Sequence, residues 1–230
     1  MKTVLSFVLS ILLLASFSFA STEGDRAKLE DRLDDAATIM NEIMAAPDKG
    51  IPEDVLNSAK CVAIVPHMVK AGLGIGGQHG KGVATCKNTQ GWSAPAFFTI
   101  SGGSFGLQIG AEGVDLVMLI MNEKGMQALL SDKFEVGGDA SAAAGPVGRD
   151  AAAGTDWKLK SPILTYSRSK GAFAGISLNG SAIRQDRDST KALYGQQMTS
   201  QQLLAGQVPV PPEAKGFLTT VARAQTVAAK

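Results

Sequence analysis

Two cysteines and two histidines are the residues of this chain with the widest chemical range, and they lie close together in the sequence. Their order is Cys61, His67, His79 and Cys86, with five, eleven and six residues between neighbours. This spacing matches no zinc finger or zinc ribbon pattern. The spacing therefore gives little support to a metal site. Thiols oxidise outside the cytoplasm, where the N-terminus described below places this chain, so a disulfide between Cys61 and Cys86 is favoured.

A glycine pattern within the same stretch has the form of a dinucleotide-binding motif. Gly72, Gly74 and Gly77 satisfy G-x-G-x-x-G. That motif binds a pyrophosphate only where a helix follows it directly, because the helix N-terminus holds the anion. Here a further β-prone segment follows, so we interpret these glycines as positions where a sheet bends and predict no nucleotide cofactor.

Catalytic patterns are scarce in the sequence. It contains neither a G-x-S-x-G elbow nor an H-E-x-x-H motif, and two histidines leave little scope for a Ser/His site. Asp186 and Asp188 flank Arg187 where a loop enters a predicted helix, and capping that helix is their favoured role over binding a ligand. We therefore predict a protein that is not an enzyme, with no catalytic residues, no metal and no cofactor.

The N-terminus has the features of a secretory signal peptide. Lys2 precedes an apolar run over residues 4–14, and small residues stand one and three places before Ser21. We expect cleavage between Ala20 and Ser21 and a periplasmic or secreted protein. Residues 21–230 then form one predicted domain, with a helical part over 21–58, a glycine-rich β core over 59–184 and a second helical part over 185–230.

Charge is balanced overall but unevenly distributed. Without Lys2 the chain has 21 basic and 21 acidic residues, which gives no reason to expect a nucleic-acid partner. Residues 21–58 contain ten acids and four bases, whereas residues 59–87 contain four lysines and no acid. Residues 156–191 contain seven bases and three acids. The last two segments are therefore candidates for contact with an anionic partner.

Periodicity predicts helices at both ends and strands between them. Apolar residues recur at helical spacing from Asp25 to Met44, opposite an acidic face, and we expect this helix to pack on the core rather than on lipid. Further helices are expected from residue 52, over 123–130, 189–194 and 200–205, and from residue 211. Predicted strands lie at 61–65, 73–77, 82–86, 96–101, 105–111, 115–121, 162–167 and 172–178. Residues 137–154 are expected to be a long connection of small residues.

Short connections between these strands favour antiparallel pairing, and the many glycines favour a sheet that curls. The predicted fold class is therefore α+β, with a curved, barrel-like antiparallel sheet flanked by N-terminal and C-terminal helices.

Four ordered runs resemble the SYLF domain. They are AGLGIGG at 71–77, PAFF at 95–98 followed by SGGSFGLQIG at 101–110, AGPVG at 144–148, and YSRSKGAFAGIS at 166–177. The similarity extends over roughly residues 30–228. It implies a lipid-binding domain, since eukaryotic members bind phosphoinositide membranes and some bind or bundle actin. Those members begin with a basic amphipathic segment, whereas the corresponding helix here is acidic.

The resemblance and the local charge together predict an exported module that contacts anionic phospholipid or a membrane surface. The candidate headgroup contacts are Lys60, Lys70, Lys81, Arg168 and Lys170. Candidate apolar contacts, for which a place in the core is the favoured alternative, are Phe97, Phe98, Phe105 and Phe173. The competing interpretation is a structural or protein-interaction domain of the cell envelope, with a protein partner in place of lipid. A role in binding actin fits an exported protein poorly.

Overall fold

The structure is a computed structural model that describes residues 2–45, 50–147, 161–169, 172–176 and 178–227. Within these ranges it leaves out the side chains of residues 2–22, 44, 73–75, 104–110, 169, 172–175 and 226–227. Lys170 lies outside the described residues.

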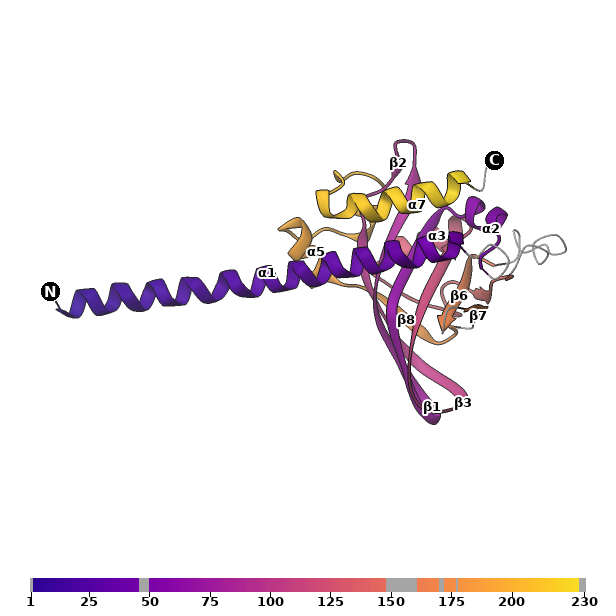
Figure 1. Ribbon diagram of the computed structural model, residues 1–230, viewed down its shortest axis with the longest axis horizontal. Helices are drawn as coiled ribbons and strands as arrows, with labels where there is room; N and C mark the ends of the chain where they lie inside the picture. Colours follow the sequence, from indigo (N-terminus) through magenta and orange to yellow (C-terminus); the bar gives the residue numbers. More distant parts are fainter. Residues whose placement is uncertain (1, 46–49, 148–160, 170–171, 177, 228–230) are drawn as a thin grey trace.

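Helices lie at both ends of the chain and strands fill its middle (Figure 1). The helical elements are α1 (Lys2–Ala45), α2 (Glu53–Ser58), α3 (Glu123–Leu130), α5 (Arg187–Tyr194), α6 (Ser200–Leu204), the 3-10 turn η2 (Pro212–Ala214) and α7 (Lys215–Val227). The strands are β1 (Cys61–Asn88), β2 (Gly91–Trp92), β3 (Ala96–Ile120), β4 (Lys133–Glu135), β5 (Ala142–Ala144), β6 (Ile163–Ser169), β7 (Ala172–Gly175) and β8 (Ser181–Gln185).

Two long strands, β1 and β3, form the centre of the sheet, and both bend back on themselves. The start of β1 pairs with the end of β3, at Cys61 and Ile120, while the end of β1 pairs with the start of β3, at Ala84 and Ala96. The backbone amide of Lys87 donates to the carbonyl of Lys60 at 2.8 Å, which brings the two ends of β1 together. The sheet therefore curls into a half-barrel, with the bends of β1 and β3 projecting from the body at the bottom of Figure 1.

The predicted fold class is confirmed, with two differences in detail. Three predicted strands between residues 61 and 86 are one continuous strand, and so are three between residues 96 and 121. The sheet is also mixed, because β5 pairs with β6 in parallel over Ala142–Ala144. That strand falls in the segment expected to be a connection, where alanines provide no alternation of apolar and polar residues.

Alternation along β1 divides the core into two layers. Cys61, Ala63 and Val65 point into the curl of the sheet, where they join an inner cluster. Val62 and Ile64 point outward and pack against the helices α1, α2 and α7. On α1 the buried residues recur at helical spacing, as predicted: Leu29, Leu33, Ala36, Met40 and Ile43.

Helices α1, α2 and α7 cover the outer face of the curled sheet, where α1 and α7 run side by side (Figure 1), whereas α3 and α6 pack against the inner cluster. Arg223 on α7 donates to Asn41 on α1 at 2.6 Å, and Arg26 pairs with Glu213. Where side chains are described, no helix combines the length and the apolar composition needed to cross a membrane.

The predicted disulfide between Cys61 and Cys86 is present, and it joins the two ends of β1 across a Cα–Cα distance of 4.0 Å. It closes the bend of this strand beside the hydrogen bond from Lys87 to Lys60. The bridge therefore fastens the sheet at the end opposite to its projecting bends.

Candidate functional site

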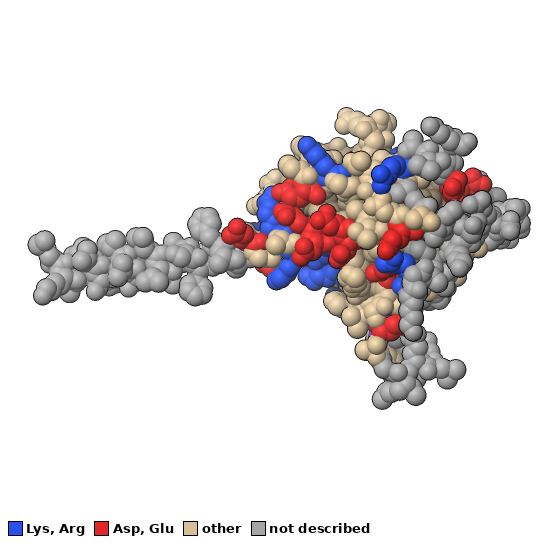
Figure 2. Space-filling model, in the orientation of Figure 1, with Lys and Arg blue, Asp and Glu red and all other residues tan. Residues whose placement is uncertain are grey.

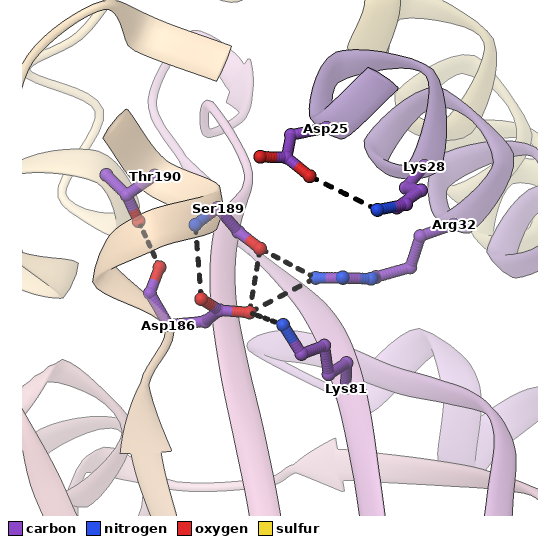
Figure 3. Close-up of polar contacts among 7 residues, drawn as sticks. All are labelled: Asp25, Lys28, Arg32, Lys81, Asp186, Ser189 and Thr190. Carbon is purple, nitrogen blue, oxygen red and sulfur yellow. Dashed lines mark hydrogen bonds and ion pairs between the residues drawn. The ribbon is translucent and has the colours of Figure 1, made fainter. Parts of the chain in front are cut away.

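A polar pocket of about 220 Å³ lies where α1, β1 and α5 meet (Figure 3). Its lining comes from α1, from the second half of β1 and from the first turns of α5. The lining residues are Asp25, Lys28, Leu29, Arg32, Lys81, Asp188, Ser189 and Ala192. The polar contacts of two lining cations, Arg32 and Lys81, converge on one carboxylate next to this lining, that of Asp186.

Asp186 is fixed by the local fold where β8 ends and α5 begins. Its amide donates to the carbonyl of Phe97 at 2.9 Å, and its side chain caps the helix by accepting the amide of Ser189 at 3.1 Å. The Ser189 hydroxyl donates to the same carboxylate at 2.7 Å. The predicted capping role of Asp186 is confirmed, while Asp188 is exposed at the rim of the pocket.

Two cations share this one carboxylate. A guanidinium nitrogen of Arg32 lies 3.6 Å from Asp186 Oδ2, and Lys81 Nζ lies 3.3 Å from the same oxygen. Arg32 also donates to the Ser189 hydroxyl at 3.3 Å and lies over the Phe97 ring, 5.5 Å from its centroid. The Arg32 side chain is 11% exposed, whereas that of Lys81 is 51% exposed. Lys81 is therefore the cation of this pair that a ligand reaches from solvent.

The pKa values of Asp186 and Arg32 reflect both their burial and the charged groups beside them. Burial raises the pKa of Asp186, but the hydrogen bonds from Ser189 and the charge of Lys81 outweigh burial and leave it below its ordinary value. Burial lowers the pKa of Arg32, opposed by the charge of Asp186, yet a guanidinium keeps its proton at neutral pH. The trio of Arg32, Lys81 and Asp186 sums to one positive charge, and the exposed carboxylate of Asp188 at the rim balances it.

At the rim, opposite charges pair with each other. Lys28 Nζ lies 3.2 Å from the Asp25 carboxylate, one turn earlier on α1. The ammonium, guanidinium and hydroxyl groups of the lining are donors suited to an anion such as a phosphate group. Across the described residues no three His, Cys, Asp or Glu side chains gather as metal ligands.

The predicted basic residues do not gather on one open face within the described structure. Lys60 lies 3.6 Å from Glu123. Lys70 is half-buried, which lowers its pKa against the opposing charge of Glu112. Lys81 lines the pocket.

Arg168 lies deeper under α1 than an open lipid contact would require. It binds Asp115 at 2.6 Å and pairs with Glu42 on α1. On α1, Arg32 lies beside Asp186, the partner of Lys81, and Glu42 pairs with Arg168. Arg32 and Glu42 are ten positions apart, or about 15 Å along the helix. Lipid contact by any of these basic residues stays a prediction.

Two of the four candidate phenylalanines belong to the core. Phe97 is fully buried beneath the helices, and Phe98 lies on the inner face of the sheet at 4% exposure. The side chains of Phe105 and Phe173 fall outside those that the structure describes.

Sequence reasoning missed Arg32 and Ser189. A signal was present, because Arg32 directly precedes the buried Leu33 on a helix whose exposed face is acidic. A base at the edge of a buried stripe indicates a buried acidic partner, but nothing local identifies that partner as Asp186, more than 150 residues away.

Comparison with known proteins gives a consistent result. Residues 101–224 match the family model Ysc84, described as "Las17-binding protein actin regulator". Protein YSC84 of Saccharomyces cerevisiae is 37% identical over 182 residues, which cover 77% of this chain and 38% of the relative. SH3 domain-containing YSC84-like protein 1 of Homo sapiens is 31% identical over 196 residues, covering 82% of this chain and 57% of the relative. The matched region thus spans between about a third and three fifths of these relatives.

Proposed function

The chain belongs to the Ysc84 family, the SYLF-domain family that its motifs resemble, and on this premise we propose that it is an exported, non-enzymatic domain that binds anionic phospholipid. In this proposal residues 1–20 are removed on export. The mature domain then meets the membrane from outside the cytoplasm.

The observation that supports this proposal best is the shared carboxylate of the pocket. Arg32 and Lys81 face one Asp186, so a phosphate group entering the pocket meets two cations that share a single buried carboxylate. The volume of about 220 Å³ suits a headgroup rather than an acyl chain. Lys81, half exposed at the opening, makes the direct contact.

A protein partner is the second candidate, because relatives are named for binding Las17. One surface of this chain favours it. Figure 2 shows acidic side chains gathered over α1, where Glu30, Asp35 and Glu42 are each about half exposed. Such a surface repels anionic lipid and suits a basic protein segment.

Replacing Lys81 tests the lipid proposal. Lys81→Gln should weaken binding to phosphatidylcholine vesicles containing phosphatidylglycerol about fivefold, since one lysine near an anionic surface contributes about 1 kcal/mol. Co-sedimentation at low and at physiological salt measures the effect. Lys191→Gln is the matched control, because Lys191 is exposed on α5, one of the elements around the pocket, but does not line the pocket.

Binding that responds equally to both substitutions would show that net charge matters and the pocket does not. A wild-type chain that ignores anionic vesicles at every salt concentration would overturn the lipid proposal and favour a protein partner.

A further inference from the structure

The projecting bends of β1 and β3 contain no charged residue. Residues 71–80 and 101–111 amount to 21 positions without a single Asp, Glu, Lys or Arg. At the 19% share of charged residues in this chain, 21 positions would include about four. These two segments pair with each other and form the far end of the ribbon in Figure 1, which we call the tip.

Where the tip joins the body, the usual placement of charged and apolar side chains is reversed. Lys70 and Glu112 are paired in register, and the two-residue period of a strand places Lys70 on the same face as Met68, which is fully buried. Burial there lowers the pKa of Lys70 against the opposing charge of Glu112. The charged pair thus occupies the sheltered face.

The opposite face is apolar and open to solvent. Its described register positions are Val69 opposite Gly113 and Ala71 opposite Ala111. Val69 is 51% exposed, the one large hydrophobic side chain in the described structure that is so exposed. Ala71, Ala111 and Gly113 are exposed as well.

The size of this face decides what can cover it. Two cross-strand pairs cover roughly 130 Å², from the spacing of strands and of residues along them. A stable protein interface needs roughly 800 Å² on each partner, which this face does not approach. A bilayer sets no such threshold, because each apolar side chain that leaves water adds to binding separately.

We propose that the tip, together with the adjoining pair Val69 and Gly113, is the membrane-contacting element, and that Val69, Ala71 and their register partners enter the interfacial layer of a lipid bilayer. This inference rests on the proposed lipid function and adds an apolar contact to it. An open sheet cannot span the hydrocarbon because its edge groups would lack hydrogen-bond partners, so the contact is confined to the interface.

The tip and the pocket are separate surfaces. Lys81 at the pocket is seven positions after Gly74 in the bend, about 23 Å of extended strand. The bend therefore lies beyond the roughly 8 Å over which a fixed charge acts at physiological salt.

A charge placed on the apolar face provides the first test. Val69→Glu in the full chain, processed by the cell as it is exported, should weaken binding to phosphatidylcholine vesicles containing phosphatidylglycerol about tenfold. Thr89→Glu is the matched control, because Thr89 is exposed in the turn after β1 at the closed end of the ribbon, outside the tip, and receives the same charge. This control should weaken binding less than about threefold. Both variants should keep the melting temperature of the wild type, since both sites are exposed.

A fluorescent label provides the second test. Since Cys61 and Cys86 are bonded to each other, a thiol introduced as Val69→Cys can be labelled selectively with a polarity-sensitive dye. Emission should shift to the blue when these vesicles are added. The same label at Ser58→Cys, on α2 away from the ribbon, should not respond.

The outcomes separate the two proposals. If the wild type binds vesicles while Val69→Glu binds equally well and the label stays in water, the tip inference is wrong and the lipid function stands. If the wild type binds no vesicles, both fall. A blue shift without vesicles, with sedimentation as a dimer, would overturn the inference in favour of a second copy of the chain.

Discussion

At the scale of single residues, Asp186 has two structural roles at once. It caps α5 through Ser189 and neutralises part of the charge of Arg32 and Lys81, with a side chain only 5% exposed. Each role alone is common, but here one carboxylate ties the first turn of α5 to α1 and to β1. This carboxylate therefore helps to hold together the three elements that form the pocket.

Removing the charge of Asp186 should destabilise the fold. Asp186→Asn keeps an oxygen that can cap α5 but leaves the nearly buried Arg32 without its counterion, which should lower the free energy of unfolding by about 3 kcal/mol. Asp188→Asn, on the exposed side of the same turn, should change it by less than about 0.5 kcal/mol. Urea unfolding measures both. Equal stability of the two variants would contradict the structural role of Asp186.

The pH dependence of this effect has a definite sign. The pKa of Asp186 in the folded protein lies below its ordinary value of 3.8, because the bonds from Ser189 and the charge of Lys81 outweigh burial. Its stabilisation is therefore complete above the ordinary value and lost as the pH falls through the folded value. The gap between the wild type and Asp186→Asn should narrow only in that acidic range.

At the scale of elements, α1 shows how far the sequence alone determines packing. The spacing of Leu29, Leu33 and Ala36 predicted a helix docked on the core, and these residues are buried. The acidic opposite face predicted that this helix would not lie on anionic lipid, and that prediction has not been tested.

An acid in the buried stripe of α1 tests both statements. Leu33→Asp should lower the free energy of unfolding by about 4 kcal/mol, because the side chain is 1% exposed and a carboxylate would lose its water there. Asp34→Ala, one position along on the exposed face, should have little effect on stability. A Leu33→Asp chain that kept full stability but lost vesicle binding would mean that α1, rather than the sheet, contacts lipid.

The strands were harder to predict than the helices, for a physical reason. The helix over Glu123–Leu130 was located correctly because its periodicity and its Asn122 cap are local signals. The glycine-rich sequence between residues 61 and 86 was predicted to form three short strands, yet it forms the single strand β1. A Cβ at Gly76 would lie 2.1 Å from the carbonyl of Ala71, so the glycine permits a close approach within the bent strand. Contacts of this kind are invisible to a local pattern.

The candidate site was predicted only in part, because the contacts that form it also join residues far apart in the sequence. Lys81 was singled out and lines the pocket, but its partner Asp186 was expected only to cap a helix. Arg168 was predicted to contact a headgroup, and in the structure it is paired with Asp115 and Glu42. Charge sums along the sequence identify basic segments, whereas the fold decides which acid lies beside each base.

At the scale of the whole molecule, one long ribbon separates two ends with different chemistry. The disulfide of Cys61 and Cys86 and the helices lie at the closed end, and the uncharged tip lies at the other. Because β1 bends back on itself, fixing its two ends together limits how far the curled sheet can open. The orientation of the tip relative to the pocket thus depends on the closure of the ribbon.

Reducing the disulfide should therefore weaken the whole fold. With a sequence separation of 25, the bridge should contribute about 3.5 kcal/mol by restricting the unfolded chain. In a chain of this length that loss should lower the melting temperature by roughly 10 °C. Calorimetry with and without reductant measures it, and a variant with both cysteines replaced by alanine should melt at the temperature of the reduced wild type and ignore reductant.

Since the cytoplasm keeps thiols reduced, protein retained there by deletion of residues 1–20 should contain free thiols, whereas exported protein should contain none. Free thiols in protein recovered from outside the cytoplasm, or a melting temperature indifferent to reductant, would contradict the bridge.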